Sequence, residues 1–320
     1  GLQMSNAKSA AAVPTPAPAK RKGGHVSWRT LEALKGASFT WPFLAGFIFF
    51  VIIPVVMALQ VSLYSKQKSG LGLGEATTKF VGLQNILNAM RDTTFWAGLG
   101  RVALYAVIVV PLTQILSMAI ALLIDASSRK MAGRFRIFLL LPYMTPGIVA
   151  TTIWIYLYSP SVGPLTPFFK AIGLNVNFFS SNMVWGSIGQ MAIWGGLGFN
   201  MLIMYGSLQA IPGEVIEAAR LDGASEFRIA RSIKVPYMLT SVALTTMLNI
   251  IGTVQLFDQP FLFRSVSPQT ITKDFTPAMM IYNQAFQVGN LNYATALSIV
   301  LAVIMGIASG IIYKLQNREK

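Results

Sequence analysis

The chain has 320 residues, of which 54% are hydrophobic and only 11% are charged, whereas soluble domains carry about 25% charged residues. This composition excludes an ordinary soluble domain and predicts an all-α integral membrane protein. The net charge of +14 does not indicate nucleic-acid binding, because the basic residues lie beside apolar runs and not along an aromatic-lined basic groove. With no cysteine, and His25 as the only histidine, the sequence offers no thiolate or histidine metal site.

Three parts follow one another along the chain. Residues 1–38 are predicted to form a disordered cytosolic arm, because their Ala-, Pro- and Lys-rich composition cannot bury enough apolar surface to order the backbone. Residues 39–314 are predicted to form one transmembrane domain, and residues 315–320 a short cytosolic tail. The segments expected outside the membrane on the non-cytosolic face are too short to hold a ligand-capturing domain.

Six apolar runs are long enough to cross about 30 Å of hydrocarbon, which needs roughly 20 helical residues. Pro54, Pro111, Pro142 and Pro146 lie inside or at the ends of these runs, where neighbouring helices can re-satisfy the kinked backbone. The predicted spans are Phe39–Leu63, Ala97–Ile124, Ile137–Tyr158, Val184–Leu208, Met238–Phe263 and Ala294–Tyr313.

The distribution of Lys and Arg predicts how these spans are oriented. Cytosolic segments of membrane proteins carry an excess of Lys and Arg. If both termini are cytosolic, 17 of the 25 basic residues lie on the cytosolic side. The polar segment 209–236, between the fourth and fifth spans, then also faces the cytosol.

The segment 209–236 is predicted to form two short helices with a bend. Pro212 suits a first helical turn, because its missing N–H has no helical partner there. Gly223 can adopt the left-handed conformation that ends a helix, and Ser225 can cap the helix that follows. Pro236 opens the next apolar run.

Within this segment, Glu217-Ala218-Ala219 is followed after three residues by Gly223, and after nine more by Ile233-Lys234-Val235-Pro236. This spacing resembles the EAA loop of ABC-importer permeases, E-A-A-x3-G-x9-I-x-L-P, with Val235 in place of Leu. The resemblance implies the type I importer fold, with six transmembrane helices and a cytosolic coupling helix that docks on a separate ATPase subunit. An amphipathic linker on the membrane surface is the alternative. The implied coupling residues are Glu217, Ala218, Ala219, Asp222, Gly223, Ile233 and Pro236.

Further stretches resemble the carbohydrate permeases of the maltose and glycerol-phosphate class. They are Phe80-Val81-Gly82-Leu83-Gln84-Asn85, Leu140-Leu141-Pro142-Tyr143-Met144-Thr145-Pro146 and Asp222-Gly223-Ala224-Ser225. The likeness extends from about Pro42 to Lys314. It implies transport of a mono- or oligosaccharide, and another neutral polyol or a glycerol phosphodiester is left open.

The depth of the membrane indicates where a substrate would bind. A helix rises 1.5 Å per residue, so the bilayer midplane lies roughly ten residues in from each span end. On the fourth and fifth spans, this depth holds aromatic, amide and small residues, which suit a neutral sugar, and the resemblance also implies a sugar site on these spans. Packing between helices is the alternative explanation for small residues and amides. The candidate substrate residues are Gly196, Phe199, Asn200, Asn249, Gly252, Thr253 and Asp258.

Asp258 stands apart from the other candidates, because it is the only acidic residue well within a predicted span. An intramembrane carboxylate is a functional candidate by default. We expect it to form a structural ion pair with Arg101, near the outer end of the second span. Contact with substrate hydroxyls is the alternative.

No phosphate-binding loop of the form G-x-x-x-x-G-K-[ST] is present, since Gly70-Leu71-Gly72-Leu73-Gly74 has no following lysine. The chain is therefore not expected to be an enzyme or to bind a cofactor, and ATP and Mg²⁺ would bind to partner subunits. The resemblance implies a prokaryotic inner-membrane complex with a second, different permease subunit, two ATPase subunits and an extracytoplasmic sugar-binding protein. The alternative function is an ion-coupled secondary transporter of a small neutral solute, which would need titratable groups at the midplane.

Overall fold

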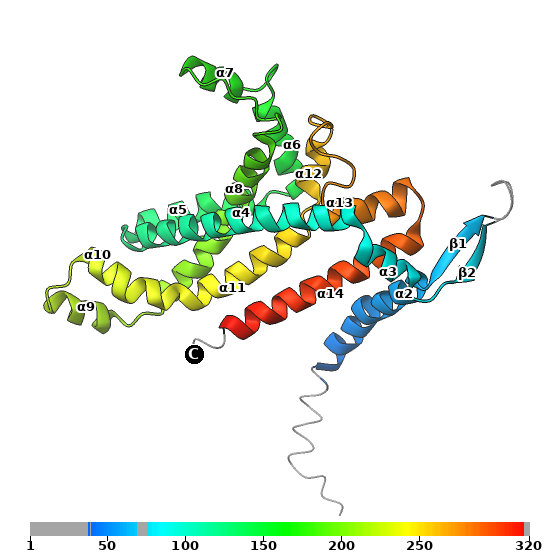
Figure 1. The fold of residues 1–320 in the computed structure, drawn as a ribbon. Coiled ribbons are helices and arrows are strands. Elements are labelled where there is room, and N and C mark those ends of the chain that lie inside the picture. The colour runs from blue at the N-terminus through cyan, green and yellow to red at the C-terminus, as the bar shows by residue number, and fades with distance from the viewer. Residues whose placement is uncertain (1–37, 39, 69–75, 317–320) are drawn as a thin grey trace, which may run out of the picture. The chain divides into compact units, whose positions relative to one another are not determined.

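The computed structural model describes residue 38 and residues 40–68 and 76–316 (Figure 1). The predicted arm at 1–38 lies outside these residues except for residue 38, as does most of the predicted tail at 315–320. The chain divides into two compact units, residues 1–55 and 56–320.

The described part of the first unit is helical and belongs to the first predicted span. A membrane-length apolar helix covers Thr40–Ser62, and its side chains between residues 40 and 55 are mostly exposed. A π-helical turn, Ile48–Ile52, precedes helix α2, Ile53–Ser62. The turn lies just before Pro54, whose missing N–H and bulky ring prevent a regular helical hydrogen bond.

The second unit contains the remaining spans and the segments that connect them. Its helices are α3 (Gln84–Arg91), α4 (Thr93–Asp125), α5 (Arg129–Met144), α6 (Gly147–Tyr158), α7 (Leu165–Ala171), α8 (Val184–Gln209), α9 (Gly213–Leu221), α10 (Glu226–Ile229), α11 (Val235–Val254), α12 (Asp258–Phe263), α13 (Pro277–Tyr282) and α14 (Leu291–Gln316). Two further π-helical segments, Ala230–Lys234 and Asn283–Gln287, precede α11 and follow α13.

Helix α4 is central to the packing of this unit. It contacts both α8 and α11, and α11 also contacts α14 (Figure 1). Near the α9 end of these helices, a buried methionine-rich cluster includes Met201, Met204 and Met238. Toward the opposite ends, a second cluster includes Ile188 and Phe263. These side chains come from different spans, so the same residues that make each span apolar also hold the spans together.

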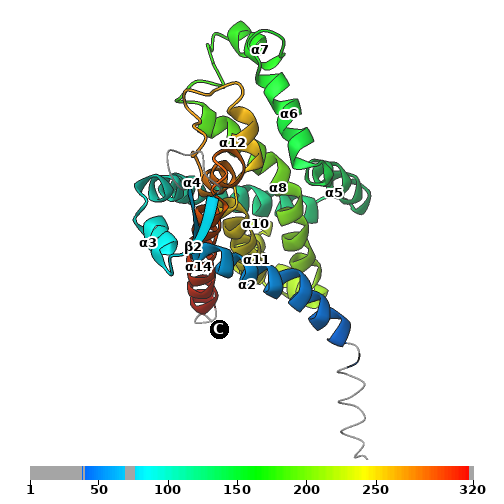
Figure 2. The same ribbon diagram turned by 90° about the vertical axis from the view of Figure 1, so that its right-hand side faces the viewer.

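Five helices are long and apolar enough to cross a membrane among the residues that the structure describes, and the bent pair α5–α6 gives a sixth when counted as one span. The predicted third span, 137–158, is therefore not a straight helix. Its two parts meet at 95° (Figure 2). The break falls at Thr145, which has the extended conformation (ψ 127°). The ring of Pro146 disfavours a helical conformation for the residue before it, which explains the break.

The fifth predicted span is also interrupted. Helix α11 ends at Val254 and α12 begins at Asp258, so the carboxylate lies at a helix start, within the membrane-length segment Glu226–Phe263 that includes both helices.

A β-hairpin follows α2, although the sequence predicted helices alone. Its strands β1 (Tyr64–Lys68) and β2 (Ala76–Phe80) are antiparallel, with Tyr64 opposite Phe80. The amide of Asn85 donates to the carbonyls of Ser62 and Tyr64 (2.9 and 2.8 Å) and so fixes the base of the hairpin against α3.

Candidate functional site

The segment 209–236 forms the predicted pair of short helices. Helix α9 begins directly after Pro212, which takes the N-cap position, one residue before the predicted first turn. Gly223 has φ +78°, as predicted for the residue that ends this helix. The N–H of Ala224 donates to the carbonyl of Ala219 (3.0 Å), which is the closing bond of a Schellman motif. A side chain at residue 223 would strain the turn, so a glycine is needed there.

The second helix begins as predicted at Ser225. The hydroxyl of Ser225 accepts a hydrogen bond from the N–H of Arg228 (3.3 Å) and caps α10. Ile229 is buried and anchors this helix to the body of the unit. Helix α10 then continues through the π-helical segment that contains Ile233 into α11, where Pro236 occupies the first turn.

Most side chains of helix α9 are not covered by the rest of the chain. None of its residues is buried, and Glu217 and Ala218 are exposed, whereas Ala219 is half-buried. Leu221 and Phe227 are 89% and 75% exposed. Large apolar side chains that are exposed together often mark a surface that binds another protein.

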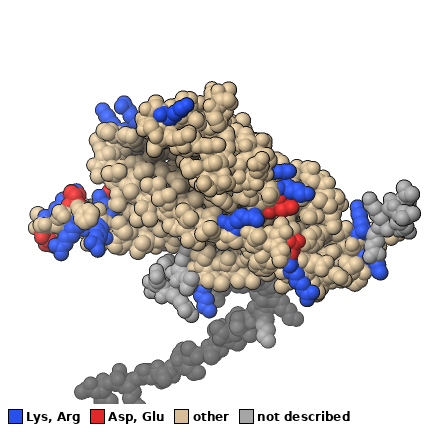
Figure 3. All heavy atoms as spheres, turned by 45° about the horizontal axis from the view of Figure 1, so that its top comes forward, with Lys and Arg blue, Asp and Glu red and all other residues tan. Residues whose placement is uncertain are grey.

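Charged side chains gather on this part of the molecule, at the left-hand end of Figure 3, whereas a broad area beside it carries none. Arg220 of α9 and Glu226 of α10 form an ion pair with Nε and Oε1 2.8 Å apart. The hydrogen bond to Glu226 raises the pKa of the Arg220 guanidinium. Asp222, a predicted coupling residue, is exposed at the end of α9.

Four of the predicted substrate residues come together between α8 and α11. The amide of Asn249 donates to Oδ1 of Asn200 (2.9 Å), and the hydroxyl of Thr253 donates to the carbonyl of Asn249 (2.7 Å). A Cβ placed on Gly196 would lie 3.6 Å from Nδ2 of Asn200 and 3.8 Å from Oδ1 of Asn249. These contacts place Gly196, Asn200 and Asn249 in one polar group, and Thr253 lies one helical turn from Asn249.

Two residues that the sequence analysis did not name belong to this polar group. The hydroxyl of Thr245 donates to Oε1 of Gln114 (3.0 Å), which joins α11 to α4. Among the described residues, Nε2 of Gln114 and Nδ2 of Asn200 are buried without a hydrogen-bond partner. The midplane estimate applied to the second span, ten residues back from Ile124, would have found Gln114. We call Gln114, Asn200, Thr245 and Asn249 the amide cluster.

Phe199 lies in a different place. Its ring stacks on Tyr143 of α5, with centroids 4.7 Å apart and planes 12° apart. Tyr143 borders a hollow of about 240 Å³ at the α5–α6 bend. Trp154, Trp194 and Gln259 also line this hollow, so it combines aromatic faces with an amide.

Gly252 and Asp258 do not join the amide cluster. Gly252 is exposed, and a Cβ added to it would meet no atom within 4 Å. Asp258 is exposed beside the bend, where its Oδ2 would lie 3.5 Å from a Cβ on Gly147. The two ion pairs of the described residues do not include Asp258.

The expected ion pair between Asp258 and Arg101 was therefore wrong. Arg101 instead donates from Nη1 to the carbonyl of Phe275 (2.8 Å), and its guanidinium lies 5.1 Å from the centroid of the Phe275 ring. The break between α11 and α12 explains the difference, because it moves Asp258 out of the continuous helix assumed in the prediction. In the part of the chain that the structure describes, no three His, Asp or Glu side chains are grouped to hold a metal ion.

Comparisons with known proteins bear on this arrangement. Residues 115–320 match the family model described as "binding-protein-dependent transport system inner membrane component". The diacetylchitobiose uptake system permease protein NgcF of Streptomyces coelicolor is 29% identical, over 86% of this chain and 80% of that protein. The arabinooligosaccharides transport system permease protein AraP of Bacillus subtilis is 27% identical over 99% of both chains.

The fold is also similar to that of a solved structure. A chain from a bacterial ABC transporter that imports the acidic polysaccharide alginate superimposes with a TM-score of 0.74, covering 91% of this chain and 99% of that one at 17% identity. The matches agree with the family indicated by the EAA spacing. The chain therefore belongs to the family of binding-protein-dependent transport system inner membrane components, the multi-pass permease subunits of ABC transporters.

Proposed function

We propose that this chain is the permease subunit of an ATP-driven importer for a neutral mono- or oligosaccharide. The observation that carries the proposal is the helix α9, which begins after Pro212, ends in a Schellman motif at Gly223 and leaves Glu217 and Ala218 of the EAA triplet exposed. Relatives named for the uptake of diacetylchitobiose and arabinooligosaccharides support the substrate class.

The coupling helix would work through the chemistry of its exposed side chains. Glu217 offers a carboxylate to a basic group on the ATPase subunit, and the small Ala218 and Gly223 let the two surfaces approach closely. Leu221 and Phe227 supply apolar surface that the ATPase would cover. Asp222, Ile233 and Pro236 belong to the same coupling segment, and ATP and Mg²⁺ would bind to the ATPase subunits alone.

The sugar would contact the hollow at the α5–α6 bend and the amide cluster. Aromatic faces such as those of Tyr143 and Trp154 suit the apolar faces of sugar rings, and amides suit their hydroxyls. The carboxylate of Asp258 lies beside Gly147, which borders this hollow; it can accept hydrogen bonds from hydroxyls but would repel an anionic sugar. A neutral sugar is therefore the substrate class that this chemistry favours.

The other subunits of the complex can be inferred from what six spans cannot do alone. Six spans cannot enclose a transport path alone, so a second, different permease subunit completes it, with two ATPase subunits at the cytosolic face. An extracytoplasmic binding protein delivers the sugar, since the outer segments are short. ATP binding would close the ATPases, move α9 with them and switch the access of the sugar site from one side of the membrane to the other.

Uptake of a panel of labelled sugars into proteoliposomes that contain the purified complex tests this proposal. Uptake should require ATP inside, together with the binding protein outside. Glu217→Ala should lower uptake at least tenfold while the complex still assembles, because an interface charge that pairs with a partner costs several kcal/mol to remove. Glu214→Ala, on the same helix and also exposed, is the matched control and should transport normally.

The alternative function makes opposite predictions for the same measurement. An ion-coupled secondary transporter would take up sugar in response to a proton or sodium gradient, without ATP, and Glu217→Ala would have no effect. The first proposal would then be abandoned.

A further inference from the structure

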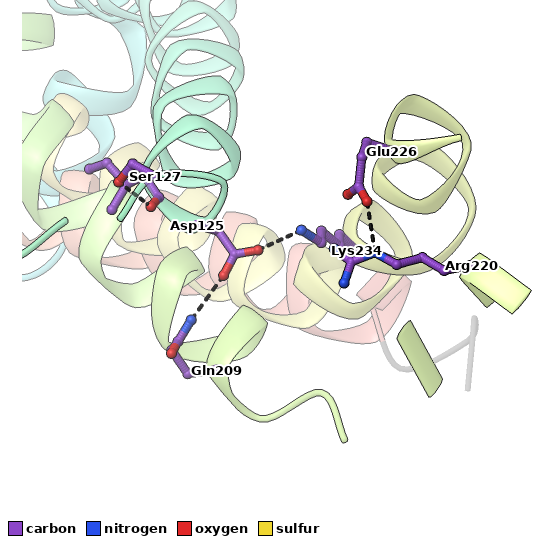
Figure 4. A network of polar contacts seen from close by, with 7 residues as sticks. Asp125, Ser127, Gln209, Arg220, Glu226 and Lys234 are labelled. Carbon is purple, nitrogen blue, oxygen red and sulfur yellow. Dashed lines mark hydrogen bonds and ion pairs between the residues drawn. The ribbon is translucent and has the colours of Figure 1, made fainter. Parts of the chain in front are cut away.

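Three helix ends meet at one carboxylate next to the coupling helix (Figure 4). Asp125 is the last residue of α4, Gln209 is the last residue of α8, and Lys234 directly precedes α11. Nζ of Lys234 lies 2.6 Å from Oδ2 of Asp125, and Nε2 of Gln209 donates to its Oδ1 over 2.9 Å. One carboxylate therefore holds both ends of the segment 209–236. We call these three residues the carboxylate clamp.

The ion pair of the clamp is shielded from solvent, unlike the other ion pair nearby, whereas Gln209 is exposed. The side chains of Lys234 and Asp125 are 13% and 15% exposed, whereas those of Arg220 and Glu226 are 55% and 65% exposed. Exposed pairs contribute little, because water and salt screen them. A shielded pair is different, because removing one partner leaves an uncompensated charge in a place with little water. Of the two ion pairs, the one between Lys234 and Asp125 is therefore the one whose loss costs more, and it is also the one that joins the segment to α4.

Between the clamp and α9 lies a polar hollow of about 320 Å³, lined by both Glu217 and Arg220 of α9 and by Asp125 and Lys234 of the clamp. No residue of α9 is buried, and only Ile216 and Ala219 are half-buried, so side-chain packing holds this helix weakly. A displacement of α9 reaches α8 and α11 through the two ends of the segment, and on the α11 side also through the buried Ile229 of α10. Both of those ends are held at Asp125.

The clamp also connects the segment to the amide cluster. Helix α4 runs without interruption from Thr93 to Asp125, and it carries Gln114. Eleven residues of helix separate Gln114 from Asp125, which is about 16 Å. Thr245 of α11 donates to Gln114, so α4 and α11 are joined both at the clamp and at the depth of the amides.

We propose that Asp125 is a positioning residue for energy coupling: it makes the ends of α4, α8 and α11 move as one body when the ATPase displaces α9. The proposal rests on the proposed function, since it assumes that α9 is the coupling helix. Without the carboxylate, α9 would still dock and ATP would still be hydrolysed, but less of the displacement would reach the amide cluster.

The experiment measures sugar transported per ATP hydrolysed by the complete complex in proteoliposomes. Asp125→Asn keeps an oxygen for Gln209 and removes the charge that Lys234 needs, and it should lower the ratio about tenfold, within the range typical of coupling between sites. The exchange Asp125→Lys with Lys234→Asp should restore most of the ratio. Ser127→Ala is the matched control, because its hydroxyl bonds only to the carbonyl of Ile124 within its own helix end (2.7 Å).

If Asp125 had only a structural role, its replacement would lower the amount of assembled complex and leave the ratio of sugar transported to ATP hydrolysed unchanged. An assembled Asp125→Asn complex with a normal ratio therefore overturns the proposal, as does an assembled exchange variant that stays uncoupled. If neither variant assembles, Gln209→Ala decides, because it keeps the ion pair and frees only the end of α8. A ratio lowered at least twofold supports the clamp, and an unchanged ratio overturns it.

Glu217→Ala, measured in parallel, separates the two proposals. If it uncouples transport while Asp125→Asn does not, the clamp alone is rejected. If the unmodified complex shows no ATP-driven uptake, the proposed function fails first.

Discussion

At the scale of single residues, Asn249 joins α11 to α8 at the depth of the amide cluster. Its Nδ2 donates both to Oδ1 of Asn200 and to the carbonyl of Thr245 (2.9 and 2.6 Å). Hydrogen bonds between membrane helices contribute only about 0.6 kcal/mol on average. Stability alone therefore gives little reason for three amides here, two of which are buried and have unpartnered N–H groups among the described residues. Spare donors are what a site for sugar hydroxyls requires.

Replacing Asn249 separates packing from substrate contact. Asn249→Leu should change the stability of the complex by roughly 1 kcal/mol or less, yet raise the KM for sugar uptake at least tenfold, because a site that bonds hydroxyls depends on its polar groups. Uptake kinetics and thermal unfolding of the same preparation measure both effects. Thr152→Val is the control, since that hydroxyl bonds within its own helix. An unchanged KM would assign the amides to helix packing.

At the scale of elements, the approach of α5 to α8 depends on one glycine. A Cβ on Gly198 would overlap the carbonyl oxygen and carbonyl carbon of Leu139. Both are backbone atoms, so relief requires the helices to separate. The stack of Tyr143 on Phe199 lies across the same pair of helices, so any separation would also open the aromatic side of the proposed sugar site.

Gly198→Ala should destabilise the complex by roughly 1–3 kcal/mol, the usual cost of overpacking, and weaken sugar uptake. Gly206→Ala, on the same helix with no atom within 4 Å of the added Cβ, should be neutral or slightly stabilising, since alanine favours helix. Thermal unfolding followed by tryptophan fluorescence compares the two variants. Equal unfolding temperatures would show that α5 does not pack this closely on α8.

Elements differ in how far local sequence predicts them. The caps at Gly223 and Ser225 were predicted, because each depends on residues within one helical turn. The direction of the bend after α5 was not predicted, although Pro142 and Pro146 were identified as positions where a helix can kink. A proline removes a hydrogen bond locally, but the contacts of α5 with α8 and of α6 with α12 determine where the two parts lie.

At the scale of the whole molecule, the charge distribution predicts that α9 and both termini face the cytosol. The chain contains no cysteine, so single cysteines can report the orientation. Ser225→Cys, at the start of α10, and Ser161→Cys, after α6, place thiols at exposed positions. In right-side-out vesicles, a membrane-impermeant maleimide should label residue 161 directly, and residue 225 only after permeabilisation. The reverse pattern would refute the predicted orientation.

The sequence by itself determined the membrane class, the approximate position of each span and the local form of the coupling segment. These features depend on composition, apolar length and capping, all of which are read within a few turns of chain. Only the tertiary structure decided the contacts between Lys234 and Asp125, 109 residues apart, and between Thr245 and Gln114, 131 residues apart. It also separated Phe199 and Asp258 from the amide cluster. Helix packing sets which polar side chains meet at the same depth, and the pattern along a single helix does not contain that information.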